Sequence, residues 1–397
     1  MRITVVGLGY VGGVVAAGLA NAGHQVLGVD VDKRKVLSFR KSAVPFYEPG
    51  LAELIEKGLR AGTLQFCHPD EVDRLWEGVI FITVGTPSQP YGGTDLSQVY
   101  AAIRWIKERN CGHSVIVMKS TVPPGTGIRL IEEELSETEL TYVANPEFLR
   151  EGQAVHDWFN PSRIIIGARD KDSAELVKDL YHNINAPILL TDITTAEMIK
   201  YAANAFLATK ISFINEIANL CDRVGANIDE VSQGIGLDPR IGTAFLRAGL
   251  GYGGSCFPKD VRALEFLSSM LGCNLELLRA VINVNTRQRL LLIQRLCELF
   301  PRLKNVEVAV LGLAFKPNTS DVREAPAIDI IRLLVELGAS VRAFDPQAME
   351  AARPFLPAQV KMPSSITETL RGAQAVVLVT EWPEFIELHW EEVAKIL

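Results

Sequence analysis

Short apolar runs and longer amphipathic segments alternate along the first half of the chain. Runs rich in β-branched residues, typical of buried strands, occupy residues 3–6, 25–29, 79–84, 115–118, 142–144 and 163–166. Segments with apolar side chains at helical spacing separate several of these runs, at residues 13–21, 96–109 and 124–135. Strands that alternate with helices in this way predict a parallel sheet covered by helices on both faces.

The hydrophobic pattern changes in the middle third of the chain. Residues 194–224 contain neither proline nor glycine, and Ala, Ile, Leu and Met recur at helical spacing. This pattern predicts one continuous helix of about eight turns. Further helical segments follow at 228–233, 260–270 and 274–300, so we expect the whole region to be helical.

The last third returns to the opening pattern. A strand at 306–311 leads into Gly312, a helix at 325–337 follows, and the next strand, 340–344, ends in Asp345. One more strand is expected at 375–380. The chain is therefore predicted to be an α/β protein with two Rossmann-like doubly wound domains joined by a central all-helical region. The predicted domain boundaries are 1–191, 192–300 and 301–397.

Composition and charge argue against several classes of protein. The 40 basic and 47 acidic residues give a net charge of −7, which is not typical of a general nucleic-acid binder. No apolar run approaches the ~20 residues of a membrane-spanning helix, and the glycines within residues 1–22 argue against a secretory signal. The six cysteines form no CxxC pair and lie near no histidine pair at zinc spacing. We therefore expect no metal site, free thiols and a cytoplasmic location.

A glycine-rich turn follows the first predicted strand. Gly7 permits a tight turn, Gly9 lets the backbone approach a pyrophosphate, and Gly12 lets helix and strand pack closely. Asp30 lies 18 residues after Gly12 and would accept hydrogen bonds from an adenosine ribose. Its charge would repel a 2′-phosphate, so the motif predicts NAD rather than NADP. The basic residues at 34 and 35 are interpreted as a solvated helix start, and a glycine turn of another α/β fold is the alternative.

A second glycine run precedes a cysteine in the middle region. Cys256 stands just before a predicted helix start, with Lys259 close by, and this setting lowers a thiol pKa. Glycines let a ligand approach the backbone, and four precede this cysteine: Gly249, Gly251, Gly253 and Gly254. A buried structural thiol is the commoner role of cysteine. That role suits the remaining cysteines: Cys67, Cys111, Cys221, Cys273 and Cys297.

Polar residues with a candidate chemical role also lie on the long helix and after two strands. Lys200 and Asn204 are one turn apart, so they share a helix face, and the residues around them are apolar. A lysine and an amide directed at one point could hold a developing oxyanion. Residues 119–126 and 145–151 follow strands of the first domain, where α/β proteins bind ligands, although each is also compatible with a capped turn.

Several sequence blocks resemble the nucleotide-sugar dehydrogenases of the UDP-glucose/GDP-mannose dehydrogenase family, most closely the branch that acts on UDP-glucose. The blocks are GLGYVG (7–12), YEPGL (47–51), VGTP (84–87), KSTVPPGT (119–126), NPEFLREG (145–152), AEMIKYAANAFLATKISFINEIAN (196–219), GYGGSCFPKD (251–260) and LGLAFKPNTSDVREAP (311–326). The match spans nearly the whole chain.

The resemblance implies oxidation of a sugar C6 alcohol to a carboxylate with two NAD⁺ reduced. By analogy Cys256 attacks the intermediate aldehyde, and the thiohemiacetal becomes a thioester that water cleaves. Lys200 and Asn204 would stabilise the oxyanions. The resemblance also implies that Thr121 and Asp260 position a water molecule that acts as base. Glu147 would assist hydrolysis of the thioester.

The resemblance also implies which residues bind cofactor and substrate. The cofactor positions are Gly7, Gly9, Tyr10, Val11, Gly12, Asp30, Lys35, Thr86, Thr121, Glu151, Lys259 and Arg323. The substrate positions are Glu147, Phe148, Leu149, Arg150, Glu151, Lys200, Asn204, Arg240, Phe245, Leu246, Arg247, Ala248, Gly249, Gly253 and Lys316. In the family the long helix pairs two subunits and the position of Arg240 reaches the neighbour's site, so a homodimer is expected.

The resemblance also implies a departure at the end of the sequence. The family chain continues beyond Leu397 with a strand that carries an Asp-Gly-Arg-Asn motif. We therefore expect the second nucleotide domain to lack a strand, to be the less stable part and to bind substrate less well. Three alternatives stay open: a GDP-mannose dehydrogenase, an inactive nucleotide-sugar binder, and an ordinary two-domain NAD dehydrogenase.

Overall fold

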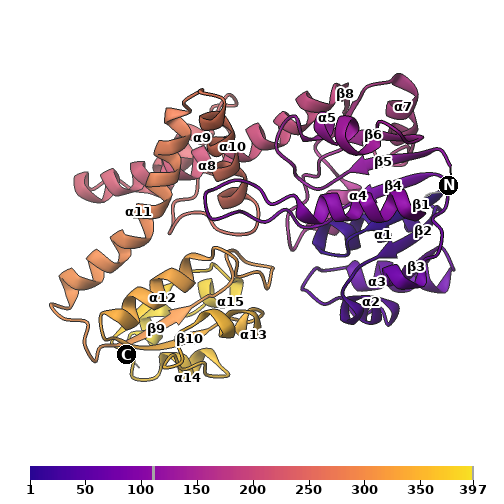
Figure 1. Ribbon diagram of the computed structural model, residues 1–397. Coiled ribbons are helices and arrows are strands. Elements are labelled where there is room, and N and C mark those ends of the chain that lie inside the picture. Colours follow the sequence, from indigo (N-terminus) through magenta and orange to yellow (C-terminus); the bar gives the residue numbers. More distant parts are fainter. Residues whose placement is uncertain (110–111, 396–397) are drawn as a thin grey trace. The chain divides into compact units, whose positions relative to one another are not determined.

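The computed structural model describes residues 1–109 and 112–395 (Figure 1). The chain divides into two compact units, Met1–Ala202 and Ala203–Leu397. The boundary falls within α8 (Ile193–Val224), a continuous helix of 32 residues. This helix confirms the long helix predicted from the absence of proline and glycine.

The first unit is built on an eight-stranded sheet in the order β3-β2-β1-β4-β5-β6-β7-β8. Its strands are β1 (Arg2–Val6), β2 (Gln25–Val29), β3 (Leu64–Cys67), β4 (Val79–Ile82), β5 (Ser114–Met118), β6 (Leu140–Ala144), β7 (Ile164–Ala168) and β8 (Ile188–Thr191). Neighbouring strands are parallel except for the pair β6 and β7. The strand order reverses at β1, as in a doubly wound fold, which confirms the predicted fold class.

The pair β6 and β7 is antiparallel, which is the one departure among the described strands of this unit from the predicted parallel sheet. The connection between the two strands contains α6 (Ala154–Phe159), a helix of six residues. Six helical residues rise only about 9 Å, roughly half the ~17 Å length of a five-residue strand. α6 does not carry the chain back along the full length of β6, and β7 runs antiparallel beside β6.

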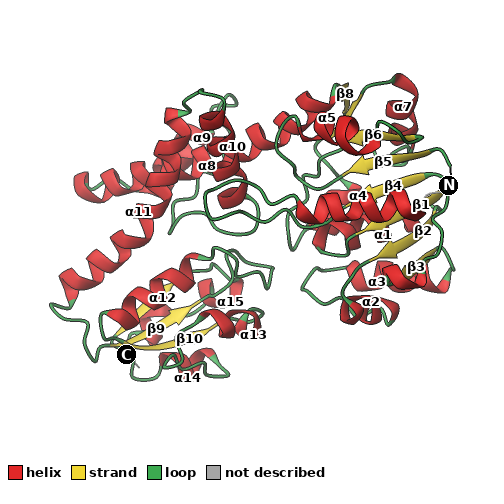
Figure 2. Ribbon diagram, viewed as in Figure 1, coloured by secondary structure: helices red, strands yellow, loops and turns green. Residues whose placement is uncertain are grey.

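Helices lie against the sheet of the first unit (Figure 2), and a hydrophobic core fills the space on each of its two faces. Side chains alternate along each strand, so Ile3 and Val5 of β1 join one core while Val6 joins the other. The first core also contains residues from α1 (Tyr10–Asn21), α2 (Lys33–Arg40), α3 (Leu51–Arg60), α6 and α7 (Lys171–Asp179). The second contains residues from α4 (Ser97–Arg109), α5 (Thr126–Leu130), the π-helix Ile131–Leu135 and the start of α8.

The second unit contains helices followed by a small sheet. After α8 come α9 (Ile228–Gly236), α10 (Phe257–Met270) and α11 (Glu276–Leu299). A parallel three-stranded sheet follows, in the order β10 (Ser340–Phe344), β9 (Glu307–Leu311), β11 (Ala375–Leu378). Its helices are α12 (Pro326–Glu336), α13 (Met349–Ala352), α14 (Ile366–Leu370), α15 (Pro383–Ile386) and α16 (Trp390–Val393). Within the described part of the chain, no helix has both the length and the apolarity needed to cross a membrane.

The small sheet repeats the glycine turn of the first unit. Gly312 has φ +99° and its amide donates to Phe344 O at 2.8 Å, as Gly7, with φ +98°, donates to Val29 O at 2.8 Å. Asp345 follows the second strand and is completely buried. Its carboxylate accepts hydrogen bonds from five donors, namely the amides of Leu313, Ala314, Gln347 and Ala348 and the indole N–H of Trp382.

The cysteines differ in burial more than the sequence predicted. Cys221 is buried and Cys67 is half-buried, whereas Cys273 and Cys297 are exposed. The prediction of a core position was wrong for these two, because Cys273 lies in the loop after α10 and Cys297 faces away from the core beside buried Leu296. Cys111 lies outside the described residues.

Candidate active site

The glycine turn after β1 leaves room for an anion at the start of α1. Gly9 is the N-cap of α1, and no side chain caps this helix end. A Cβ at Gly9 would meet no atom within 4 Å, whereas a Cβ at Gly12 would lie 1.8 Å from Gly7 O. Gly12 is therefore required for packing, and open space adjoins the first N–H groups of the helix. These features fit a dinucleotide pyrophosphate.

Asp30 holds this turn in place. Its Oδ2 accepts a hydrogen bond from Leu8 N at 2.7 Å and its Oδ1 accepts one from Asp32 N at 2.8 Å. Lys35 Nζ lies 3.6 Å from Oδ2, so this lysine pairs with Asp30, while the Arg34 side chain is almost fully exposed. Each carboxylate oxygen can accept a second hydrogen bond, so Asp30 can serve both the turn and a ribose.

Two predicted cofactor residues contact one another at the end of the sheet. The Thr86 hydroxyl donates to Thr121 O at 3.0 Å, and the Ser120 hydroxyl donates to Val84 O at 2.7 Å. The turn after β5 is thereby fixed to the loop after β4. Both lie beyond the carboxyl ends of these strands, where doubly wound sheets bind ligands.

Glu147 and Lys200 form a buried ion pair. Lys200 Nζ donates to Glu147 Oε1 at 3.1 Å, and the two side chains are only 5% and 6% exposed. Glu147 Oε2 accepts from Leu149 N at 2.5 Å, and Lys200 Nζ also lies 5.1 Å from the Phe148 ring centroid. A buried ion pair with supporting contacts fixes both groups firmly, because removing either partner would strand the other charge.

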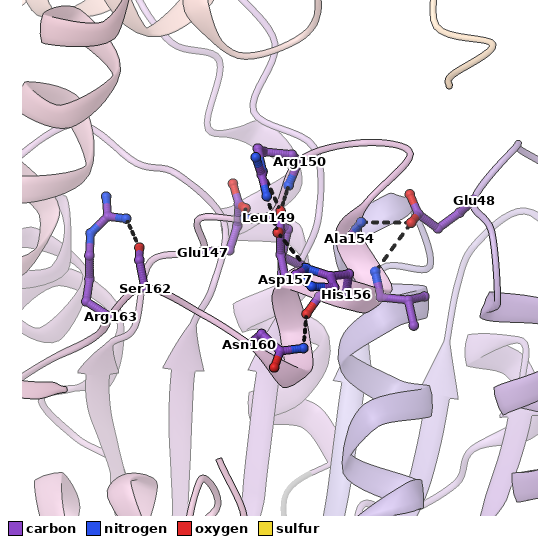
Figure 3. A network of polar contacts seen from close by, with 11 residues as sticks. Glu48, Glu147, Leu149, Arg150, Ala154, His156, Asp157, Asn160, Ser162 and Arg163 are labelled. Carbon is purple, nitrogen blue, oxygen red and sulfur yellow. Dashed lines mark hydrogen bonds and ion pairs between the residues drawn. The ribbon is translucent and has the colours of Figure 1, made fainter. Parts of the chain in front are cut away.

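The segment after Glu147 is fixed by two further carboxylates (Figure 3). Asp157 accepts bonds from Arg150 Nε at 2.9 Å, Arg150 Nη2 at 2.6 Å and the Arg150 amide at 2.9 Å. Burial acts to raise the pKa of Asp157, but the hydrogen bonds from Arg150 outweigh it and the pKa is lowered. Glu48 accepts from Gly152 N and Ala154 N, both at 2.7 Å, and so fixes the start of α6.

Glu48 was not identified as a site-forming residue from the sequence. It lies within residues 47–51, which entered the sequence argument only as a block of resemblance. The structure gives it a physical role, since its buried carboxylate satisfies backbone donors of a segment about a hundred residues further along the chain. A single acid in a loop between Pro45 and Pro49 has no local signature of burial, so this contact could be found only from the fold.

Lys119 is a second buried group that the sequence argument did not single out. Its Nζ donates to Asn145 Oδ1 at 2.9 Å and to the Tyr181 hydroxyl at 3.0 Å. Burial lowers the pKa of Lys119 to about 7; the charge of Glu147 opposes this effect and that of Lys200 adds to it. Both residues that hold Lys119 at hydrogen-bonding distance, Asn145 and Tyr181, are neutral.

In the second unit Cys256 lies at the start of α10. It is the N-cap residue, half-buried, and its Sγ lies 3.5 Å from Ser255 Oγ. Asp260, one turn further along α10, accepts from Asn204 Nδ2 at 2.6 Å and from Lys259 Nζ at 2.5 Å.

Three of the four glycines before Cys256 are required by packing or by their backbone conformation. A Cβ at Gly253 would lie 2.4 Å from Glu324 O, and one at Gly254 would lie 2.7 Å from the Phe315 ring. Gly251 and Gly254 also adopt φ of +95° and +85°, which side chains rarely permit. Gly249 differs, because a Cβ there would meet nothing within 4 Å. Of the four, Gly249 is the one that leaves open space.

The other predicted substrate and cofactor residues of the second unit lie in several settings. Phe245 has φ +64°, Leu246 is buried, and Gly249 N donates to Asn215 Oδ1 at 2.8 Å. Lys316 Nζ lies 5.7 Å from the Phe315 ring centroid. Three arginines pair with acids close to them, as Arg240 with Asp238, Arg247 with Glu381 and Arg323 with Asp321.

The structure thus brings some predicted residues into direct contact and not others. Thr86 meets Thr121 and Glu147 meets Lys200 in the first unit, and Asn204 and Lys259 meet Asp260 in the second. Lys200 and Asn204 lie one turn apart on α8. Among the residues that the structure describes, no group of three or more His, Cys, Asp or Glu side chains could hold a metal ion.

Family models match the chain along most of its length. Residues 1–185 match the NAD binding domain of the UDP-glucose/GDP-mannose dehydrogenase family, residues 194–287 its central domain, and residues 309–397 its UDP binding domain. The first of these matches confirms NAD as the predicted cofactor.

Individual relatives resemble the chain over nearly its full length. It is 44% identical to the UDP-glucose 6-dehydrogenase TuaD of Bacillus subtilis, over 100% of this chain and 87% of that protein. The solved UDP-glucose dehydrogenase of Pyrobaculum islandicum is 41% identical with a TM-score of 0.94, over 98% of this chain and 92% of that one. The UDP-D-ManNAc dehydrogenase of Pyrococcus horikoshii is 28% identical with a TM-score of 0.88, over 100% of this chain and 93% of that one. The chain belongs to the UDP-glucose/GDP-mannose dehydrogenase family.

Proposed function

We propose that the protein is a UDP-glucose 6-dehydrogenase, which oxidises the C6 alcohol of UDP-glucose to the carboxylate of UDP-glucuronate. The observation that carries this proposal is the pair of buried clusters on α8, Glu147 with Lys200 and Asn204 with Asp260. Cys256 at the start of α10 supplies the nucleophile that a second oxidation needs. NAD, when bound, accepts one hydride in each of the two oxidations.

The first oxidation requires a base for the proton of the C6 hydroxyl. Thr121 and Asp260 hold a water molecule that takes this proton, so the C6–H bond can release its hydride and the aldehyde forms. Asp260 is suited to this role because Asn204 and Lys259 fix both of its oxygens. Lys200 stabilises the developing negative charge on the C6 oxygen.

The second oxidation proceeds on Cys256. The thiolate adds to the aldehyde carbon, a C–S bond forms, and the carbonyl oxygen becomes an oxyanion that Lys200 and Asn204 stabilise. Loss of the second hydride turns this thiohemiacetal into a thioester. Water then adds to the thioester carbon, Glu147 takes the proton of that water, and the C–S bond breaks to release the acid and Cys256.

The remaining assignments extend this proposal to the domains. Residues 1–191 hold NAD, residues 192–300 pair two subunits and residues 301–397 hold the nucleotide of the substrate. The homodimer is supported by a stripe of exposed apolar side chains on α8: Phe206 is 65%, Phe213 49% and Leu220 56% exposed. These residues are seven apart, which is the repeat of a helix-pairing seam.

An NADH absorbance assay with a panel of nucleotide sugars tests the function. We expect two NADH and one UDP-glucuronate for each UDP-glucose, with no free aldehyde. GDP-mannose oxidised faster than UDP-glucose would instead assign the GDP-mannose branch. Binding of UDP-glucose and NAD⁺ without NADH formation would support the inactive binder.

A further inference from the structure

A buried glutamate on α8 holds the turn that carries Thr121. Glu197 is only 3% exposed. Its Oε2 accepts from Gly125 N at 2.7 Å and its Oε1 from Gly127 N at 2.8 Å. The Tyr142 hydroxyl lies 3.5 Å from Oε1, a longer contact. Burial raises the pKa of Glu197 to about 7, although the two amide hydrogen bonds act to lower it.

The turn has little freedom to leave this carboxylate. Gly125 adopts φ +89°, and a Cβ at Gly127 would lie 2.5 Å from Ile193, 2.5 Å from the Tyr142 ring and 2.9 Å from Glu197 Oε1. At its other end the turn is fixed by the Thr86 hydroxyl, which donates to Thr121 O at 3.0 Å. The Thr121 backbone is therefore held from both sides, by the loop after β4 and by α8.

Glu197 also lies close to Lys200, the residue that stabilises the oxyanion in the proposed reaction. Lys200 follows it by three residues on α8, so the two side chains lie on one face of the helix. Thr121, Glu197 and Lys200 line one small cavity together with Ser120 and Pro146. The volume of this cavity that is open to the centre of a water molecule is about 10 Å³. This is near the smallest volume that holds one water molecule.

We propose that Glu197 is a positioning residue for the first oxidation, acting through the turn 121–127 to place the Thr121 hydroxyl relative to Lys200. This inference rests on the proposed function, because it needs Thr121 to hold the base. The first oxidation must remove a proton from an alcohol. The second starts from an aldehyde and a thiolate, which give an oxyanion directly. A displaced Thr121 therefore slows the first oxidation much more than the second.

The test compares single-turnover NADH formation from UDP-glucose with that from its C6 aldehyde, using the full chain with NAD⁺. Glu197→Gln keeps the shape of the side chain but leaves one backbone amide without an acceptor. We expect the alcohol rate to fall about 10- to 100-fold, as for a misplaced catalytic group, with the aldehyde rate changed less than about threefold. The ratio of the two rates is independent of the fraction of folded enzyme, so a purely structural defect leaves it unchanged.

Three variants complete the design. Tyr142→Phe removes the long contact to Glu197 and keeps both amide bonds, so it should keep the ratio of the unmodified protein. Glu197→Asp, whose carboxylate is one methylene shorter, is the second variant if the glutamine form does not fold, and it should lower the ratio too. Thr121→Ala should lower the ratio, and adding Glu197→Gln to it should lower it little further, because both act through one residue.

Each outcome decides the inference. A normal ratio in Glu197→Gln, with a lowered ratio in Thr121→Ala, overturns the inference and leaves the proposed function standing. Independent, multiplying effects of the two substitutions also overturn it, because Glu197 would then act elsewhere. If the unmodified protein forms no NADH from either sugar, the proposed function fails and the inference fails with it.

Discussion

Four ionisable side chains lie buried near the carboxyl ends of β5 and β6: Lys119, Glu147, Glu197 and Lys200. Two of them, Glu147 and Lys200, neutralise one another at 3.1 Å. The other two are held by neutral groups, Lys119 by an amide and a phenol and Glu197 by two backbone amides. Burial moves the pKa values of both groups to about 7, although the opposite charges of Glu147 near Lys119 and of Arg129 near Glu197 oppose the shift.

Lys119 should make stability depend on pH. Its pKa falls from the ordinary 10.5 to about 7 on folding, so the folded state takes up this proton at lower pH than the unfolded state. Burying Lys119 therefore lowers the free energy of unfolding. This cost is absent above pH 10.5, grows as the pH falls and is complete below about pH 7. Urea unfolding of the unmodified protein and of Lys119→Met at pH 7, 8.5 and 10 checks this. The unmodified protein should gain stability relative to the variant as pH rises, and a constant difference would contradict the assignment.

Cys256→Ala should separate the two oxidations. Without the thiolate no thiohemiacetal forms, so acid formation should stop while UDP-glucose binding is largely retained. Product analysis and calorimetric binding measure the two effects. Cys221→Ala, a buried thiol, should change only stability, and Cys273→Ala should change neither because that thiol is exposed. Formation of UDP-glucuronate by Cys256→Ala at a near-normal rate would contradict the covalent mechanism.

At the scale of elements, the long helices and the buried strands could be predicted from the sequence. α8 and α11 contain neither proline nor glycine, and β1, β4 and β5 are apolar except for Arg2, Thr4 and Ser114. The short strand β8 was missed, because two of its four residues are exposed and its pattern is weak. β3, α2, α3 and α7 were also missed, since none has a long apolar run.

The residues of the candidate site could be predicted from the sequence only in part. Residues within motifs, such as Gly9, Lys200 and Cys256, could be selected because their spacing has a local meaning. Glu48 and Glu197 could not, because their partners are backbone amides far away in the sequence. Every residue except proline has a backbone N–H group. The sequence therefore does not show which distant N–H group donates a hydrogen bond to a buried carboxylate.

The loop before α10 offers a test of what its glycines do. Gly254→Ala forces a left-handed residue and places a Cβ 2.7 Å from the Phe315 ring, so it should lower the free energy of unfolding by about 1–3 kcal/mol. Gly249→Ala meets nothing within 4 Å and should change it by less than about 0.5 kcal/mol. Thermal unfolding of both variants measures the difference. Equal effects would contradict the packing role.

At the scale of the whole molecule, the stripe on α8 should determine assembly. Phe213 lies at the centre of the stripe, and Phe213→Glu would place a charge in a helix-pairing seam. We expect light scattering to show a dimer for the unmodified protein at micromolar concentration and a monomer for this variant. Leu337→Glu, at an exposed apolar position at the end of α12, is the matched control and should stay dimeric. A monomer in the unmodified protein would rule out the dimer.

The glycine turn that occurs twice in the chain has a consequence for binding stoichiometry. In the first copy the acid after the second strand uses one amide for each oxygen and keeps capacity for a ribose. In the second copy Asp345 accepts five hydrogen bonds and has no exposed surface, so it cannot bind a ribose. Equilibrium titration should therefore saturate at one NAD⁺ per chain, not two. The second copy keeps the architecture of a dinucleotide fold, but its acid stabilises the fold and no longer selects a ligand.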